Sequence, residues 1–323
     1  MASARQGSPL VLISRCNLDL LREGLLQYKQ IVITGATGWL GSETAELISQ
    51  TLGEEFSSRV KLVGSSPKVK QSSTHNFQVI GWEEFKSIRS IELLIHFAFL
   101  NQDKADLVGL PKFIQTNRSI TSDINHVLSN SPGCDVLAAS SGAASYYRGN
   151  VDSTKSMEVY ASLKLESEES FLQNSNIRSL LNMRIWNVTG TGLQIDSGYA
   201  VANFFKQAMI SKHIVLTGNS ASTRTYVDVK EMMLIFLLSL ENKQKITIDS
   251  GGYQTSLFGL ASTVLSELGL PRTAISLSGE FKSASHYNPN PELFNQLASD
   301  LQLSLSTIDA QVANFAKILA DSH

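Results

Sequence analysis

The sequence lacks the features that would suit it to a membrane, a disulfide framework or a nucleic-acid surface. Only two cysteines, Cys16 and Cys134, occur in 323 residues, too few and too far apart for a disulfide scaffold or a zinc site. No run approaches the ~18 apolar residues of a membrane span, and the first residues show no secretory cleavage pattern. With a formal net charge of -2 there is no basic field for nucleic acid. We therefore expect a cytoplasmic globular protein without a metal site.

The composition that is present, with 42% hydrophobic residues, suffices for one large or two unequal domains. The most informative stretch is QIVITGATGWLG, residues 30–41, where a β-branched run ends before Gly35, Gly38 and Gly41. Gly35 can take a backbone conformation closed to other residues, Gly38 lets a pyrophosphate approach, and Gly41 lets a helix pack on the strand. The following helix directs its first N–H groups at the anion. An ordinary strand-to-helix turn is the alternative interpretation.

Apolar stretches elsewhere in the first two thirds of the chain predict further strands. They cover residues 60–63, 77–80, 92–96, 135–139 and 178–187. Helical patterns occupy residues 42–52, 113–128 and 157–172 between them. This alternation predicts parallel βαβ units, whose ligand sits beyond the carboxyl ends of the strands. Near the end of the chain a helix is expected within 304–319, with Ser306 and Asp309 as its cap.

Three side chains could carry chemistry at that edge of the sheet. Tyr160 and Lys164 are four residues apart in a helical pattern, so they share one helix face. A nearby ammonium lowers the pKa of a phenol, whose ordinary value of about 10 makes it a poor base at neutral pH. Ser141 follows a predicted strand and can donate a hydrogen bond to a substrate oxygen. The plain alternatives are a solvated helix face and a loop serine that bonds its own backbone.

The order of these three features resembles the extended short-chain dehydrogenase/reductase family, the nucleotide-sugar epimerase and dehydratase group. GATGWLG is similar to the family's GATGFIG, and LIHFAF at 94–99 is similar to its hydrophobic-His-x-Ala-Ala stretch, with Phe99 replacing the second alanine. RIWNVTGTG at 184–192 resembles its R-x-x-N-x-x-G-x-G. ANFFKQA and TGNSASTRTYVDV look like its substrate-domain motifs. The resemblance covers most of the chain from about residue 29 onward.

The resemblance implies an α/β fold: a Rossmann-type doubly wound parallel sheet with a smaller C-terminal substrate-binding domain. The predicted NAD(P)-binding domain comprises 30–187 and 222–255, and the substrate-binding domain comprises 188–221 and 256–323. Residues 1–29 would form a helical extension, because leucines recur there at helical spacing.

The resemblance also implies roles for individual residues. Tyr160 would be the acid/base, Lys164 would hold the nicotinamide ribose and lower the tyrosine pKa, and Ser141 would bond the same substrate oxygen. Asn187 and Arg224 would contact the substrate diphosphate, and Asn203 lies in a matching substrate segment. Besides Tyr160 and Lys164, the implied cofactor contacts are Gly35, Thr37, Gly38, Trp39, Leu40, Gly41, Ser65, Ser66, Lys68, Phe97, Ala98, Phe99 and Asn117.

Two departures from the family pattern bear on cofactor and reaction. Where relatives often carry an acidic residue after the second strand, this chain has Gly64-Ser-Ser-Pro-Lys68. Ser65, Ser66 and Lys68 could bind a 2′-phosphate, which favours NADP slightly over NAD. Dehydratases carry an Asp-Glu pair after the catalytic Ser or Thr, but here those positions are Gly142 and Ala143. This argues against dehydration.

The sequence thus predicts a nucleotide-sugar epimerase that removes and returns a hydride at C4 through bound NAD(P). The alternatives are an NADPH-dependent nucleotide-4-ketosugar reductase, a reductase of a non-sugar carbonyl compound, and a non-catalytic dinucleotide-binding relative. The expected partner is a nucleotide-diphosphate sugar, with neither nucleic acid nor membrane. By analogy with relatives, we expect a homodimer that pairs the long helices bearing the Asn117 and Tyr160 motifs.

Overall fold

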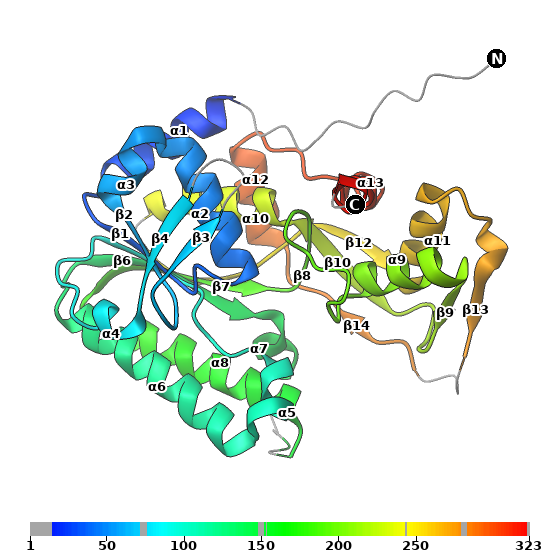
Figure 1. Ribbon diagram of the computed structural model, residues 1–323, viewed down its shortest axis with the longest axis horizontal. Helices are drawn as coiled ribbons and strands as arrows, with labels where there is room; N and C mark the ends of the chain where they lie inside the picture. The colour runs from blue at the N-terminus through cyan, green and yellow to red at the C-terminus, as the bar shows by residue number, and fades with distance from the viewer. Residues whose placement is uncertain are drawn as a thin grey trace. The chain divides into compact units, whose positions relative to one another are not determined.

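The structure is a computed structural model that describes residues 15–71, 76–147, 152, 154–242, 244–278 and 283–321 (Figure 1). The chain divides into two compact units, each described here by itself. The first unit comprises Arg15–Ile185 and Met233–Ser250, and the second comprises Trp186–Met232 and the described residues from Gly251 onward. The assignment of cofactor binding and substrate binding to separate domains stays a prediction, and these units place residues 222–232 with the second unit.

The first unit is built on an eight-stranded sheet in the order β11-β7-β6-β5-β1-β2-β4-β3. All neighbours in it are parallel except β3 and β4. Its strands are β1 (Ile31–Thr34), β2 (Val60–Val63), β3 (Lys68–Gln71), β4 (Asn76–Ile80), β5 (Leu93–His96), β6 (Cys134–Ser141), β7 (Ile177–Ile185) and β11 (Lys245–Asp249). The predicted α/β fold with a doubly wound parallel sheet is confirmed.

The order of the strands reverses on either side of β1. Ile31 pairs with Val60 of β2 on one side and with Leu93 of β5 on the other. Every β1 residue is buried, because the β-branched run that predicts the strand packs on both faces of a parallel sheet. A sheet of this type binds its ligand at the carboxyl end of such a reversal, which here lies between β1 and β5.

Helices cover both faces of this sheet (Figure 1). They are α1 (Arg15–Leu26), α2 (Trp39–Leu52), α3 (Phe56–Arg59), α4 (Trp82–Phe85), α5 (Ala105–Val108), α6 (Leu110–Ser129), α7 (Gly142–Tyr146), α8 (Ser156–Gln173) and α10 (Val229–Leu238), the last of which crosses into the second unit. Helices α6 and α8 run side by side. They match the helical patterns that the sequence shows at 113–128 and 157–172, so those predictions are confirmed.

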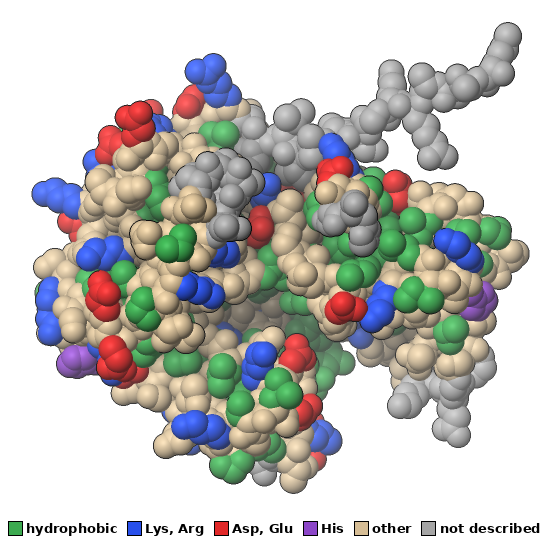
Figure 2. Space-filling view, viewed as in Figure 1, with side chains coloured by type: hydrophobic (Ala, Val, Ile, Leu, Met, Phe, Trp, Pro, Cys, Tyr) green, Lys and Arg blue, Asp and Glu red, His purple; other side chains and the backbone are tan. Residues whose placement is uncertain are grey.

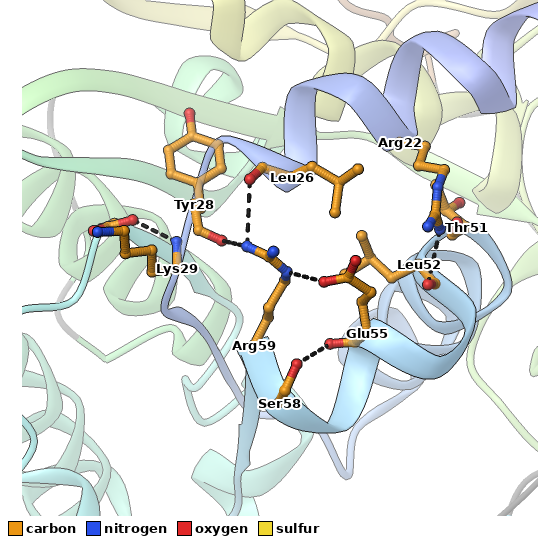
Figure 3. Close-up of polar contacts among 10 residues, drawn as sticks. Arg22, Leu26, Tyr28, Lys29, Thr51, Leu52, Glu55, Ser58 and Arg59 are labelled. Atoms are coloured by element: carbon orange, nitrogen blue, oxygen red, sulfur yellow. Dashed lines mark hydrogen bonds and ion pairs between the residues drawn. The ribbon is translucent and has the colours of Figure 1, made fainter.

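The N-terminal helix α1 is fastened to the first unit by two arginines (Figure 3). Leu21 and Leu25 of α1 are each 2% exposed, as the helical spacing of leucines predicts. Arg22 donates to the Thr51 and Leu52 carbonyls at the end of α2, both at 2.8 Å. In return, Arg59 donates to the Leu26 and Tyr28 carbonyls at 3.3 and 3.0 Å. Each arginine therefore satisfies carbonyls at or just beyond the end of a helix.

The second unit contains two small sheets and four helices among its described residues. The larger sheet has the order β12-β10-β14, with β8 also paired to β10, and β9 pairs with β13. The strands are β8 (Asn187–Thr189), β9 (Ile214–Leu216), β10 (Thr223–Asp228), β12 (Tyr253–Ser256), β13 (Ile275–Leu277) and β14 (His286–Tyr287). The helices are α9 (Ala200–Ser211), α11 (Leu257–Glu267), α12 (Glu292–Asp300) and α13 (Ile308–Asp321).

The predicted cap of the last helix is wrong. Helix α13 begins at Ile308, and the hydroxyl of Thr307 accepts from the Ala310 N–H at 3.3 Å. Ser306 instead donates its hydroxyl to Glu231 at 2.6 Å. A buried carboxylate nearby offers Ser306 a stronger partner than its own helix does.

The surface carries charges of both signs. Lysine, arginine, aspartate and glutamate side chains are interspersed on the face that Figure 2 shows. In the described part of the chain, no helix is both long enough and apolar enough to cross a membrane. Across the same residues, no group of three or more His, Cys, Asp or Glu side chains is arranged to hold a metal ion.

Candidate active site

The turn between β1 and α2 is shaped by its glycines. Gly35 has a φ of +69°, and a Cβ there would lie 2.7 Å from backbone atoms of Phe97 and Ala98. A Cβ on Gly41 would clash with the Gly35 carbonyl, so the helix can start this close to the strand only with glycine. The N-cap of α2 is Gly38, which has no side chain to bond the first N–H groups of the helix. The turn therefore fits the pyrophosphate of a dinucleotide.

A cleft of about 810 Å³ opens beside this turn. The predicted cofactor residues that line it are Gly35, Thr37, Gly38, Ser65, Phe97, Ala98 and Phe99. Those that do not belong to its lining in the described structure are Trp39, Leu40, Gly41, Ser66, Lys68, Asn117, Tyr160 and Lys164. The cleft is thus framed by the Gly-rich turn, the end of β2 and the loop after β5.

The loop after β5 is held in place from both ends. The Phe97 N–H donates to the Thr34 carbonyl at 3.1 Å, which ties the loop to β1. The amide of Asn117, 1% exposed on α6, accepts from the Leu100 N–H at 2.8 Å and donates to the Leu100 carbonyl at 3.3 Å. Asn117 therefore orders the loop that lines the cleft, and its contact with a cofactor stays a prediction.

Tyr160 and Lys164 share one face of α8, as their spacing predicts. The Lys164 ammonium lies 3.7 Å from the Phe99 ring centroid and 5.9 Å from that of Tyr160. It donates to the Ala139 carbonyl at 2.7 Å and is 6% exposed. Burial lowers the pKa of Lys164 to about 7, although the Glu168 carboxylate acts in the opposite direction. The ammonium therefore has an environment that favours the neutral amine.

Glu168 lies one turn further along α8 and is only 5% exposed. Arg184 on β7 donates to its two carboxylate oxygens at 2.9 and 2.7 Å, and the Ser140 hydroxyl donates to it as well. This bidentate pair satisfies the buried carboxylate of Glu168, while Arg184 stays partly exposed. Glu168 was not among the predicted site residues. It could have been included, because it lies four residues after Lys164 and therefore on the same helix face.

Ser141 ends β6 and caps α7. Its hydroxyl oxygen accepts from the Ala143 N–H at 3.2 Å, so the hydroxyl hydrogen can still be donated. Ser140, the residue before it, bonds Glu168 instead. Because successive strand residues alternate in direction, the two serines serve different sides of the sheet. The capping bond matches the plain alternative for Ser141 and is compatible with a role as a donor to substrate.

Lys70 on β3 is a cation near the Gly-rich turn that sequence reasoning missed. Its ammonium donates to the Ala36 carbonyl at 3.3 Å and to the Ser42 hydroxyl. Burial lowers its pKa from the ordinary lysine value. The alternating Lys-Val-Lys of residues 68–70 could have indicated an edge strand that presents both lysines on one side.

Trp82 and Asp123 form another part of the cleft wall that sequence reasoning missed. The indole N–H of Trp82 donates to the Asp123 carboxylate at 2.8 Å and its ring packs against Phe85, with centroids 4.9 Å apart. An aromatic face fixed in a cleft is suited to stacking on a planar ring. The two residues belong to separate helices, so no local pattern would have joined them.

Asn187 and Arg224, the predicted diphosphate contacts, lie on neighbouring strands of the second unit. Asn187 pairs with Tyr226 in the β8–β10 register and donates to the Thr225 carbonyl at 3.1 Å. Arg224 donates to the Ser285 carbonyl and hydroxyl, both at 3.1 Å, and its guanidinium lies 5.7 Å from the Tyr287 ring centroid. The structure therefore brings these two predicted residues together on one small sheet.

Asn203, the third predicted substrate residue, lies on α9. It is exposed, accepts from the Gln207 side chain at 2.7 Å, and lines a groove of about 500 Å³ with Asp196 and Lys206. This groove belongs to the second unit alone. The contact of Asn203 with a substrate stays a prediction.

Together these residues can perform proton transfer and hold an anionic dinucleotide. The Gly-rich turn offers helix N–H groups to a diphosphate, and Tyr160 beside a buried ammonium offers a phenol whose proton can be exchanged. The pair of Glu168 and Arg184 links β7 to α8, the helix that carries Tyr160 and Lys164.

The family model that matches the sequence is that of the NAD dependent epimerase/dehydratase family, over residues 31–249. The match covers more than half of the chain and includes the Gly-rich turn, Ser141, Tyr160 and Lys164. A comparison with curated proteins gives no match.

Solved structures share the fold over nearly the whole chain. One is a UDP-N-acetylglucosamine 4-epimerase from Methanobrevibacter ruminantium M1, with 15% identity and a TM-score of 0.72, covering 92% of this chain and 99% of that one. Another is a dTDP-glucose 4,6-dehydratase from Streptomyces venezuelae with NAD bound, with 14% identity and a TM-score of 0.69, covering 90% and 97%. With the fold and the family match in agreement, the chain belongs to the NAD dependent epimerase/dehydratase family, the extended short-chain dehydrogenase/reductases that its motifs resemble.

Proposed function

We propose that the protein is a nucleotide-sugar 4-epimerase that uses NAD(P). The observation that carries the proposal is Tyr160 with Lys164 on one face of α8, next to a cleft built on a Gly-rich turn. Two of the similar structures are named as UDP-N-acetylglucosamine 4-epimerases, which supports the substrate class.

The cofactor would be held by the cleft residues. Helix N–H groups after Gly38 would bind the pyrophosphate, while Ser65 and the loop at Phe97–Phe99 would line the two nucleoside ends. The chemistry that NAD(P) supplies when bound is acceptance and return of a hydride.

Tyr160 would exchange a proton with the C4 hydroxyl of the sugar. Lys164 in its ammonium form, which burial opposes, would make this easier, because a nearby positive charge favours the phenolate. The Ser141 hydroxyl would donate to the same sugar oxygen as negative charge develops there. Asn187 and Arg224 would bind the diphosphate of the substrate, for which the planar fork of arginine is suited.

Dehydration finds no support in the residues after Ser141. Gly142 and Ala143 are buried in the first turn of α7 and carry no acid or base. Elimination of water needs such a pair in addition to the tyrosine. We therefore propose hydride and proton transfer at a single carbon.

The test is turnover with UDP-N-acetylglucosamine, UDP-glucose and dTDP-glucose in the presence of NAD or NADP. An epimerase produces the C4 epimer, read by proton NMR, while the absorbance at the nicotinamide band returns to its starting value. Tyr160→Phe should reduce turnover by about 10² to 10⁴-fold while leaving cofactor binding nearly unchanged. Wild-type turnover in this variant would contradict the assignment of the base.

A second candidate is an NADPH-dependent nucleotide-4-ketosugar reductase, which the position of Lys70 favours. Its ammonium donates to the Ala36 carbonyl in the Gly-rich turn, and Lys70 lies two residues after the exposed Lys68 on the same side of β3. Such a cation could bind a 2′-phosphate. Lys70→Met should then weaken NADP about tenfold and leave NAD unaffected. Stoichiometric oxidation of NADPH by a 4-ketosugar nucleotide would favour the reductase over the epimerase.

A further inference from the structure

The ring of Phe99 stands between the cleft and the Tyr160–Lys164 pair. Phe99 lines the cleft, and the same ring lies 3.7 Å from the Lys164 ammonium and 5.9 Å from the Tyr160 ring in an edge-to-face arrangement. In the described structure, Tyr160 and Lys164 are not part of the cleft lining. A molecule seated in the cleft therefore meets Phe99 before it meets Lys164.

Lys164 has contacts on two sides in this arrangement. Its ammonium donates to the Ala139 carbonyl at 2.7 Å and has the Phe99 ring face on another side, and only 6% of the residue is exposed. A cation held over an aromatic face in a desolvated place is a substantial contact. A ribose that is to hydrogen-bond Lys164 must displace this ring.

The backbone of Phe99 cannot easily move to make room. The loop is tied to β1 through Phe97 and to α6 through Leu100, whose N–H and carbonyl both bond Asn117. Gly35 packs directly against the backbone at Ala98. Rotation of the Phe99 side chain is therefore the available route.

We propose that Phe99 is an aromatic gate that admits the nicotinamide half of a dinucleotide to Tyr160 and Lys164. The gate is closed in this structure, where Phe99 lines the cleft and Lys164, against its ring, does not. The proposal rests on the proposed function in naming the dinucleotide. The free energy of opening would lower the affinity for ligands that carry the nicotinamide half and would not affect the affinity for ligands that lack it.

The first test labels Lys164 in the ligand-free protein with 2,4,6-trinitrobenzenesulfonate and follows the modified peptide by mass spectrometry. Phe99→Ala should be labelled at Lys164 about tenfold faster than wild type, the size expected when a desolvated cation–π contact is lost. Leu100→Ala is the matched control, because Leu100 lines the cleft from the same loop and packs on the same buried cluster. Its labelling should match wild type.

A wild-type rate in Phe99→Ala, or an equal acceleration in Leu100→Ala, would overturn the proposal. If Phe99→Ala fails to fold, Phe99→Leu carries the test, since it keeps apolar bulk and removes the ring face. Labelling at Lys164 should still rise severalfold in that variant, and an unchanged rate would count against the gate.

The second test compares the affinities of NADH and ADP by calorimetry. Phe99→Ala should increase the affinity for NADH relative to that for ADP, and an unchanged or lower ratio contradicts the gate. If NADH binds neither protein, the proposed function fails. The labelling experiment, which uses no ligand, then still decides whether Phe99 covers Lys164.

Discussion

At Lys164, burial and a neighbouring carboxylate act in opposite directions on one ammonium group. Burial prevails, so the pKa in the folded protein is about 7, against an ordinary value of 10.5. Between those two pH values, Lys164 is therefore protonated in the unfolded chain and deprotonated in the folded chain. Where the unfolded state binds more protons, the free energy of unfolding rises with pH.

We expect the stability of wild type relative to Lys164→Met to increase from pH 7.5 to pH 9, by about 1.4 kcal/mol per pH unit at most. Urea unfolding at several pH values would measure the difference between the two proteins. A pH-independent difference would mean that Lys164 stays protonated in the fold.

Glu168 provides a second prediction at the scale of single residues. Glu168→Gln leaves the partly exposed Arg184 without its charged bidentate partner and should lower the free energy of unfolding by about 1.5 to 3 kcal/mol. It should also lower the pKa of Lys164 further, because the carboxylate that raises it is gone. Glu169→Gln, at the exposed next position, is the control and should change neither quantity.

The pairing of Tyr160 with Lys164 could be predicted because helical spacing alone puts them on one face. The contact of Phe99 with Lys164 could not, although the sequence shows Phe99 as a departure from the family pattern. That contact depends on the side-chain direction of a loop residue and on how α8 packs against the sheet to which β5 belongs. The spacing of residues along the chain gives information on neither.

At the scale of elements, helix α1 is attached by two arginines. Arg22 of α1 donates to the end of α2, and Arg59 of α3 donates to the end of α1 (Figure 3). A charged donor at the end of a helix satisfies carbonyls that the helix cannot bond itself, and it opposes the negative end of the helix dipole. The attachment of α1 therefore needs these hydrogen bonds at the ends of α1 and α2 as well as the buried leucines of α1.

Arg22→Ala should reduce the free energy of unfolding by about 1 to 2 kcal/mol, since it removes two hydrogen bonds from a charged donor. Hydrogen exchange should show faster exchange confined to α1 and the end of α2. Arg15→Ala, at the exposed start of the same helix, should leave both measurements unchanged.

Helices and strands with a clear periodic pattern of apolar residues were predictable, and those without such a pattern were not. Helix α10 contains MMLIFLL, and Met232, Leu234 and Phe236 are all buried, so no polar face reveals the helical repeat. The polar segment at Gly64–Lys68 shows no strand pattern in the sequence, yet its last residue begins β3. Lysines at the edge of a sheet give little β-strand signal in the sequence.

At the scale of the whole molecule, we propose a homodimer through α6 and α8. The groove between these helices is lined mainly by polar side chains, and Arg118 bonds Glu166 across it with two hydrogen bonds of 2.8 Å. Such an interface would be polar compared with that of most obligate dimers. Electrostatic contacts of this kind are screened by salt.

In a dimer that pairs this groove with its copy, Arg118→Glu adds negative charge beside Glu166 on both protomers, so the variant should weaken the dimer and added salt should reduce that loss. Light scattering coupled to size-exclusion chromatography would measure both effects. Lys112→Glu, on the exposed part of α6 that lines the cofactor cleft, controls for the change in net charge. A mass independent of salt and of Arg118 would place any dimer contact elsewhere.

The alternation of strands and helices was enough to predict the parallel βαβ units, whereas the doubly wound arrangement of the sheet was implied by the family resemblance. The sequence does not predict the sugar or the base of the nucleotide. Even the surroundings of Arg224, the predicted diphosphate contact, come from Ser285 and Tyr287, which are distant from it in sequence and which no local pattern joins to it. Structural relatives at 14–15% identity share the fold without fixing these choices.

The position of β3 has a consequence for behaviour at high concentration. It ends the sheet and pairs only with β4 among the described strands, and its Val69 is 55% exposed. An open edge of this kind can recruit a strand from another molecule and start aggregation. Lys68 is exposed on this strand, so a second copy adding there in register would bring lysine side chains close together. Replacement of Lys68 by an uncharged residue would therefore remove a protection against self-association.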